Sequence, residues 1–151
     1  MLVDDLLPVS KSTGKLIYAR LRNENEWWVP LIEKAYAKLH GSYEALEGGN
    51  TADAMVDLTG GVCEQIDLTT PEGKRVLSDR CLWRKFKRAR ARSQLMACSF
   101  KTMGVSLTGM MSATEQGIIL GHAYSILDVR HVKPSTLSFK KYRLLQVRNP
   151  W

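Results

Sequence analysis

The chain has 151 residues, a mass of 17.0 kDa and a formal net charge of +7, with 44% hydrophobic and 25% charged residues. This length fits one domain or two small lobes, and this composition is that of a globular protein rather than a disordered one. No stretch approaches the ~20 apolar residues that cross a bilayer, and the first residues lack the basic and apolar segments of a signal peptide.

The N-terminal part is predicted to form two short strands followed by a helix. The strands, 3–8 and 16–19, flank a turn that is rich in Ser, Thr and Gly. The helix is expected to begin after Asn25 as its N-cap, because Pro30 is tolerated only near a helix start, and to stop at Gly41. Its apolar residues recur at helical spacing: Trp28, Leu31, Ile32, Ala35, Tyr36 and Leu39.

The middle of the chain is predicted to contain two more helices and two strands. One short helix covers 51–58 and ends at Gly60-Gly61, a pair whose backbone freedom suits a hinge. Residues 62–68 are strand-like, 72–92 favour one helix, and 95–100 alternate like a strand. The long helix is expected to turn its apolar residues inward: Leu77, Cys81, Trp83 and Phe86.

The last third of the chain combines a predicted loop at 101–116 with two strands at 117–129 and 142–148. Period-2 alternation puts His122, Tyr124 and Ile126 on one face of the first of these strands. Antiparallel pairing of the two strands would bring Asn149 near the start of the His122 strand.

An amide beside His122 would hydrogen-bond one ring nitrogen and fix the tautomer of the imidazole. A histidine held in this way is the base half of a Cys–His–Asn protease site, whose cysteine lies far upstream in sequence. The plainer alternative is that His122 is a structural residue with its polar atoms satisfied.

The cysteines carry no sign of a disulfide framework or a zinc site. Cys63, Cys81 and Cys98 are an odd set without a C-x-x-C pair, and the three histidines form no ligand cluster with them. We expect buried, small apolar side chains in a reducing, cytoplasmic compartment.

Several blocks of residues together indicate a family. They are EWW at 26–28, LIEKAYAKL at 31–39, GSYEALEGG at 41–49, DLTGG at 57–61, GHAYS at 121–125 and RNPW at 148–151. In this order the blocks resemble the protease core of the calpain family, from residue 4 to the last residue. The poorest match lies at 70–117.

The resemblance implies an α+β, papain-like fold with two lobes. Residues 1–59 would be the C-terminal part of the first, helical lobe, Gly60-Gly61 a hinge, and 62–151 a β-rich second lobe truncated at its C-terminus. Calpains are cytoplasmic, calcium-dependent cysteine endopeptidases, so the resemblance implies protein substrates, and membrane association is not indicated. Calcium would bring the two lobes together.

The resemblance also assigns site residues by position. His122 matches the catalytic histidine and Asn149 the catalytic asparagine of the family. Trp151 matches the tryptophan that shields their hydrogen bond from water, which weakens electrostatic interactions. Gly49 and Gly121 match glycines whose backbone pairs with the substrate peptide; without a Cβ they let an extended chain approach closely.

Two family features lie largely outside this sequence. Glu26 matches a calcium-binding carboxylate, but its partner ligands would lie upstream. The Gln-Gly…Asp-Cys-Trp block that holds the nucleophile and part of the oxyanion hole does not occur here. No cysteine of the chain replaces it, since none stands beside a tryptophan at a helix start of the first lobe. We therefore expect an inactive fragment whose partner is the missing upstream part of the core.

Two alternatives to a protease stay open. One is a non-catalytic calpain relative that serves as a regulatory or interaction module. The other is a nucleic-acid-binding module around 84–92, where six of nine residues are basic. Charge asymmetry is compatible with it, since residues 1–75 have a net charge of −4 and 76–151 of +11. The plainer interpretation is one solvated basic helix face, and no nucleic-acid partner is expected.

Overall fold

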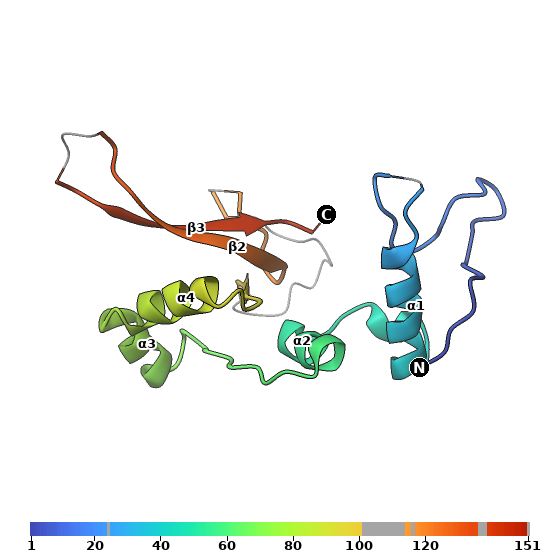
Figure 1. Ribbon diagram of the computed structural model, residues 1–151, viewed down its shortest axis with the longest axis horizontal. Coiled ribbons are helices and arrows are strands. Elements are labelled where there is room, and N and C mark those ends of the chain that lie inside the picture. Colours follow the sequence, from blue (N-terminus) through green and yellow to red (C-terminus); the bar gives the residue numbers. More distant parts are fainter. Residues whose placement is uncertain (24, 101–113, 116, 136–138, 151) are drawn as a thin grey trace. The chain divides into compact units, whose positions relative to one another are not determined.

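The computed structural model describes residues 1–23, 25–100, 114–115, 117–135 and 139–150, and it divides into two compact units, 1–50 and 51–151 (Figure 1). Helices and strands are mixed, so the predicted α+β class is confirmed. The predicted loop at 101–116 lies almost wholly outside the described residues. The elements are α1 (Trp28–His40), the 3-10 turn η1 (Glu44–Leu46), α2 (Thr51–Thr59), α3 (Pro71–Ser78), α4 (Cys81–Ala91), β1 (Ala97–Ser99), β2 (Ala123–Val132) and β3 (Tyr142–Arg148).

Helix α1 dominates the first unit. It ends at Gly41 as predicted, where φ is 103° and a side chain would be strained. The predicted N-cap at Asn25 is wrong: the cap position is Trp27, which makes no side-chain capping bond. Of the predicted apolar face, Trp28, Ile32 and Leu39 are 47–57% exposed. Periodicity therefore identified apolar residues on one face of α1, but these three side chains of that face remain largely exposed.

The two predicted N-terminal strands are reduced to one isolated antiparallel bridge between Val9 and Leu16. The predicted turn between them is present, and Ser10 N–H donates to the carbonyl of Lys15 at 2.9 Å. Side chains of α1 then hold this segment. Lys38 Nζ donates to the carbonyl of Leu2 at 2.7 Å, and Lys34 pairs with Asp4 and lowers the pKa of that carboxyl.

In the second unit, α2 agrees with its prediction and stops at Gly60, whose φ is 67°. The predicted strand at 62–68 is wrong, and Val62 in it is fully exposed. The predicted helix at 72–92 is divided into α3 and α4, because Arg80 adopts a left-handed φ of 58°. A left-handed residue interrupts the helical hydrogen-bond ladder at that position.

Strands β1, β2 and β3 form an antiparallel sheet in this order, and α4 packs on β2 (Figure 1). The strands confirm the predictions at 95–100 and 142–148 and shift the predicted 117–129 strand toward its C-terminal end. His122, Tyr124 and Ile126, which alternation placed on one face, are all buried, at 7%, 8% and 5% exposure. A β-bulge interrupts the pairing between Ile126 and Asp128.

Just past this bulge, Asp128 joins β2 to α4. Its side chain is 13% exposed, and its Oδ1 accepts hydrogen bonds from Arg90 Nε at 3.0 Å and from Val129 N–H at 2.8 Å. Arg130 pairs with the other carboxylate oxygen. The backbone bond from Val129 first, and then the two arginines, lower the pKa of Asp128 from 3.8 to about 2.

A carboxylate with a depressed pKa stabilises the fold above its ordinary pKa, and this contribution is lost as the pH falls through its folded-state pKa. We expect the urea midpoint of the chain to fall between about pH 4 and pH 2, and Asp128→Asn to flatten this part of the dependence. Asp53→Asn, at an exposed position in α2, is the matched control and should retain the parent slope. A parent slope in Asp128→Asn would show that this cluster does not contribute to acid unfolding.

Candidate active site

His122 lies directly before β2, at the end of a turn that is held from two sides. Gly121 has a φ of 68°, which favours glycine, and its N–H donates to the carbonyl of Phe100 at 2.7 Å. Upstream, Ile119 N–H donates to Tyr124 Oη at 2.9 Å. These two bonds connect the turn to the segment after β1 and to β2. They therefore fix the direction of the backbone that leads to His122.

Strand pairing brings Asn149 to this histidine. Arg148 is the register partner of Ser125, so the next residue of the chain continues toward the start of β2. His122 Nε2 and Asn149 Oδ1 are 2.8 Å apart. The structure thus unites the two residues that sequence reasoning expected to meet, although they are separated by 27 positions.

This contact determines the tautomer of the imidazole. An amide oxygen only accepts, so Nε2 of His122 carries the hydrogen and donates it to Asn149. In the neutral ring the lone pair then belongs to Nδ1. The ring of Tyr124 lies perpendicular to the imidazole, with centroids 5.1 Å apart and planes at 88°. The arrangement is that of a buried, oriented histidine whose basic nitrogen is defined.

The three cysteines of the chain differ in exposure. Cys63 and Cys81 are half-buried and Cys98 is exposed, which corrects the expectation that all three are buried. Cys98 is the register partner of Tyr124, but loss of solvation raises the pKa of its thiol. A thiol paired with a histidinium would instead have a lowered pKa. The direction of the shift at Cys98 is therefore opposite to that expected of a cysteine activated by a histidine.

Three further residues were predicted to belong to the site: Gly49, Gly121 and Trp151. A Cβ at Gly49 would meet nothing within 4 Å, so the fold itself does not require a glycine there. The N–H of Gly121 is already used by Phe100, which leaves its carbonyl as the group that can accept from a peptide. Trp151 lies outside the described residues.

Glu26 does not by itself make a calcium site. Its carboxylate accepts hydrogen bonds from Asn23 Nδ2 at 2.8 Å and from Trp28 Nε1 at 3.3 Å. Calcium takes six to eight oxygen ligands, and the described residues contain no group of three or more acidic, His or Cys side chains that could hold a metal. The part of the chain that the structure describes therefore does not fit a complete calcium site.

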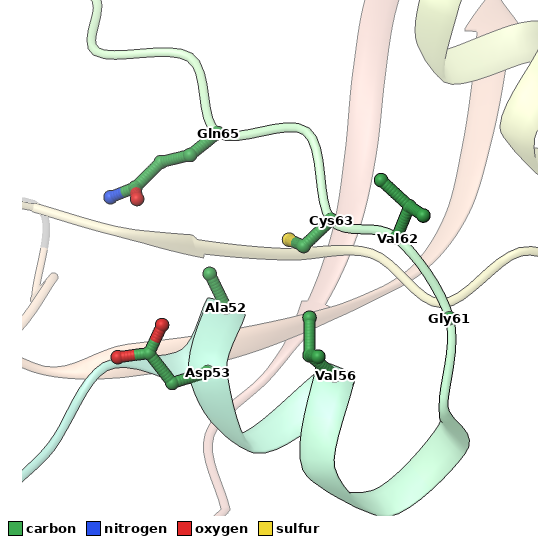
Figure 2. Close-up of a pocket in the computed structure, with 7 residues that line it drawn as sticks. All are labelled: Ala52, Asp53, Val56, Gly61, Val62, Cys63 and Gln65. Atoms are coloured by element: carbon green, nitrogen blue, oxygen red, sulfur yellow. The ribbon is translucent and has the colours of Figure 1, made fainter.

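The second unit also contains an open pocket of about 430 Å³ between α2 and the segment that follows it (Figure 2). It is lined by Ala52, Asp53, Val56, Gly61, Val62, Cys63 and Gln65. None of the predicted site residues lines it. Among the described residues, no helix is long and apolar enough to cross a membrane.

Sequence reasoning missed the contacts that support His122. The signal was available for Tyr124, because period-2 alternation had placed it on the face of His122, but alternation does not reveal that its hydroxyl bonds to Ile119. Nor did any pattern indicate that Asp128 accepts from arginines on two different elements.

Comparison with known proteins identifies the family. The whole chain, residues 1–151, matches the family described as "Calpain family cysteine protease". It is 46% identical over 157 residues to calpain-type cysteine protease DEK1 of Zea mays, covering all of this chain and 6% of that protein. It is also 42% identical over 161 residues to Calpain-5 of Mus musculus and 41% identical over 152 residues to Calpain-A of Drosophila melanogaster, in both cases over the whole chain.

The chain spans 24% of Calpain-5 and 17% of Calpain-A, a minor part of each relative. The match nevertheless runs through both ends of this sequence, including the segments that carry His122 and Asn149. The chain therefore belongs to the calpain family of cysteine proteases.

Proposed function

We propose that this chain is part of a cysteine endopeptidase, to which it contributes the general base and the residue that orients it. The nucleophilic cysteine would come from a part of the protease core that precedes these residues. The observation that carries the proposal is the buried contact of 2.8 Å between His122 Nε2 and Asn149 Oδ1. The bond joins the two residues that match the catalytic histidine and asparagine of the family, and it leaves Nδ1 as the basic nitrogen.

In the proposed mechanism Nδ1 of His122 takes the proton of the cysteine thiol, and the thiolate attacks the carbonyl carbon of the scissile peptide bond. The imidazolium is stabilised by its Nε2–H bond to the oxygen of Asn149. It then returns the proton to the leaving amine as the C–N bond breaks. Water, activated by the same nitrogen, hydrolyses the thioester and regenerates the thiol.

Substrate binding is proposed to use backbone groups at Gly49 and Gly121. With its N–H donated to Phe100, Gly121 offers its carbonyl to a substrate N–H. Gly49 is exposed with open space at its Cα, which suits close approach of an extended peptide. Trp151 is proposed to shield the bond between His122 and Asn149 from water. Such backbone pairing selects for the extended conformation of a protein substrate rather than for one particular side chain.

The domain and cellular assignments extend the same proposal. We place the lobe boundary at Gly60-Gly61, between residues 1–59 and 62–151, and we expect the enzyme to act in the cytoplasm. The three cysteines, which form no disulfide, support a reducing compartment. Calcium would be required for activity and would be held largely by residues outside this chain, with Glu26 as one possible ligand.

The test compares the 151-residue chain with the full-length protease on an unfolded protein substrate. We expect no cleavage by the chain alone, because it lacks the nucleophile, and cleavage by the full-length protein in calcium. A calcium chelator should remove that activity, and excess calcium, but not magnesium, should restore it.

The outcomes separate the parts of the proposal. Cleavage by the chain alone would place the nucleophile within it and overturn the mechanism. Full activity in the chelator would contradict the calcium requirement while leaving the protease assignment intact. An inactive full-length protein would favour a non-catalytic relative.

A further inference from the structure

Tyr124 contacts His122 in a way that the hydrogen bond to Asn149 cannot replace. The hydrogen bond from Nε2 of His122 to Oδ1 of Asn149 still allows the imidazole plane to tilt about the line between these two atoms. The ring of Tyr124 lies 5.1 Å from the imidazole at 88°, within the range of attractive perpendicular aromatic pairs. Because Tyr124 is only 8% exposed, its own ring has little freedom to move aside. The tilt of His122 is therefore limited by Tyr124.

The hydroxyl of the same residue holds the backbone that delivers His122. Tyr124 Oη accepts the N–H of Ile119 at 2.9 Å, three residues before the histidine. Between them Gly121 has its left-handed φ of 68°, which glycine adopts without strain, so the direction of the turn is set by the hydrogen bonds on either side of it. One side chain thus acts on both the ring of His122 and the turn that carries it.

We propose that Tyr124 is a positioning residue for His122, with its ring setting the tilt of the imidazole and its hydroxyl fixing the turn from Ile119 to Gly121. This inference rests on the proposed function, in which His122 is the general base. Tyr124 does not touch the reacting atoms in it. Its effect is to keep Nδ1 aimed at the position that the thiol would occupy.

The test uses Tyr124→Phe and Tyr124→Leu in the full-length protease. Tyr124→Phe keeps the perpendicular ring and removes only the acceptor for Ile119, so it should retain the fold even where Tyr124→Leu does not. We expect Tyr124→Phe to lower kcat about tenfold, with KM unchanged within about twofold, because misorientation of a base affects the chemical step rather than binding. Tyr142→Phe, the same change at an exposed position in β3, is the matched control and should leave both constants unchanged.

Two further readouts do not require catalysis. Amide hydrogen exchange of the peptide that contains Ile119 should become faster in Tyr124→Phe, because its N–H loses an acceptor. Exchange of the C2 hydrogen of the His122 ring, followed by mass spectrometry, should also become faster, because a buried ring that is held less firmly is reached more often by water.

Faster exchange at Ile119 with an unchanged kcat and unchanged ring exchange would overturn the proposal, since Tyr124 would then serve only the stability of the turn. Unchanged exchange at both places would overturn it as well. If His122→Ala retained activity, the proposed function would fail, while the ring exchange of His122 would still decide whether Tyr124 positions it.

Discussion

Replacement of His122 by Ala in the full-length protease is expected to reduce peptide cleavage by a factor on the order of 10⁵, which is loss of measurable activity. The ring is the only group in the described part of the site that can take a thiol proton and deliver it to the leaving amine. Without it the cysteine remains largely a protonated, weak nucleophile at neutral pH. The measurement is the initial rate of substrate cleavage at saturating calcium.

His40→Ala is the matched control, since it removes an exposed histidine at the end of α1. It should retain nearly full activity. Thermal unfolding of both variants distinguishes a chemical loss from a folding defect, because His122 is buried and its removal leaves a small cavity. Cleavage by a folded His122→Ala variant at the parent rate would refute the assignment of the base.

The second large effect is expected at Asn149. Asn149→Ala removes the acceptor for Nε2–H, so the imidazole can take the other tautomer or turn its basic nitrogen away. We expect kcat to fall about 100-fold, the scale of a misplaced reacting group, with a much smaller change in KM. The measurement is kcat and KM of the purified, folded Asn149→Ala variant and of the parent protein at the same calcium concentration.

Asn149→Asp provides the informative comparison, because a carboxylate also accepts from Nε2–H, and it should retain more activity than Asn149→Ala. Asn25→Ala, at an exposed position before α1, should leave kcat unchanged. Equal kcat for Asn149→Ala and the parent would show that other contacts orient the ring without the amide.

The contact between His122 and Asn149 was predictable because it depends on rules of short range. Alternation assigns the inner face of a strand, and antiparallel pairing of neighbouring strands determines which residues meet at its end. The glycine that ends α1 was predictable for the same reason, since a positive φ has few alternatives. The resemblance of the family blocks then led to the chemical roles proposed for these positions, which periodicity alone does not supply.

The errors arose where the result depends on the environment of a segment. Residues 62–68 have the composition of a strand, but a strand forms only where a partner provides its hydrogen bonds. The break between α3 and α4 falls at Arg80, a residue type with good helix propensity, so no local signal marked it. Trp28 and Leu39 recur at helical spacing, yet spacing does not specify what covers them.

The bulge in β2 divides the β2–β3 hairpin into two consecutive runs of paired residues. Only two register pairs, Ser125 with Arg148 and Ile126 with Val147, separate the bulge from the end where His122 meets Asn149. Beyond it, a longer ladder runs from Asp128 to Val132. A bulge leaves one residue unpaired and disrupts the ladder locally. The alignment of His122 with Asn149 therefore depends most directly on the two register pairs on the near side of the bulge, so substitutions at these four positions should disturb that contact more than substitutions in the longer ladder.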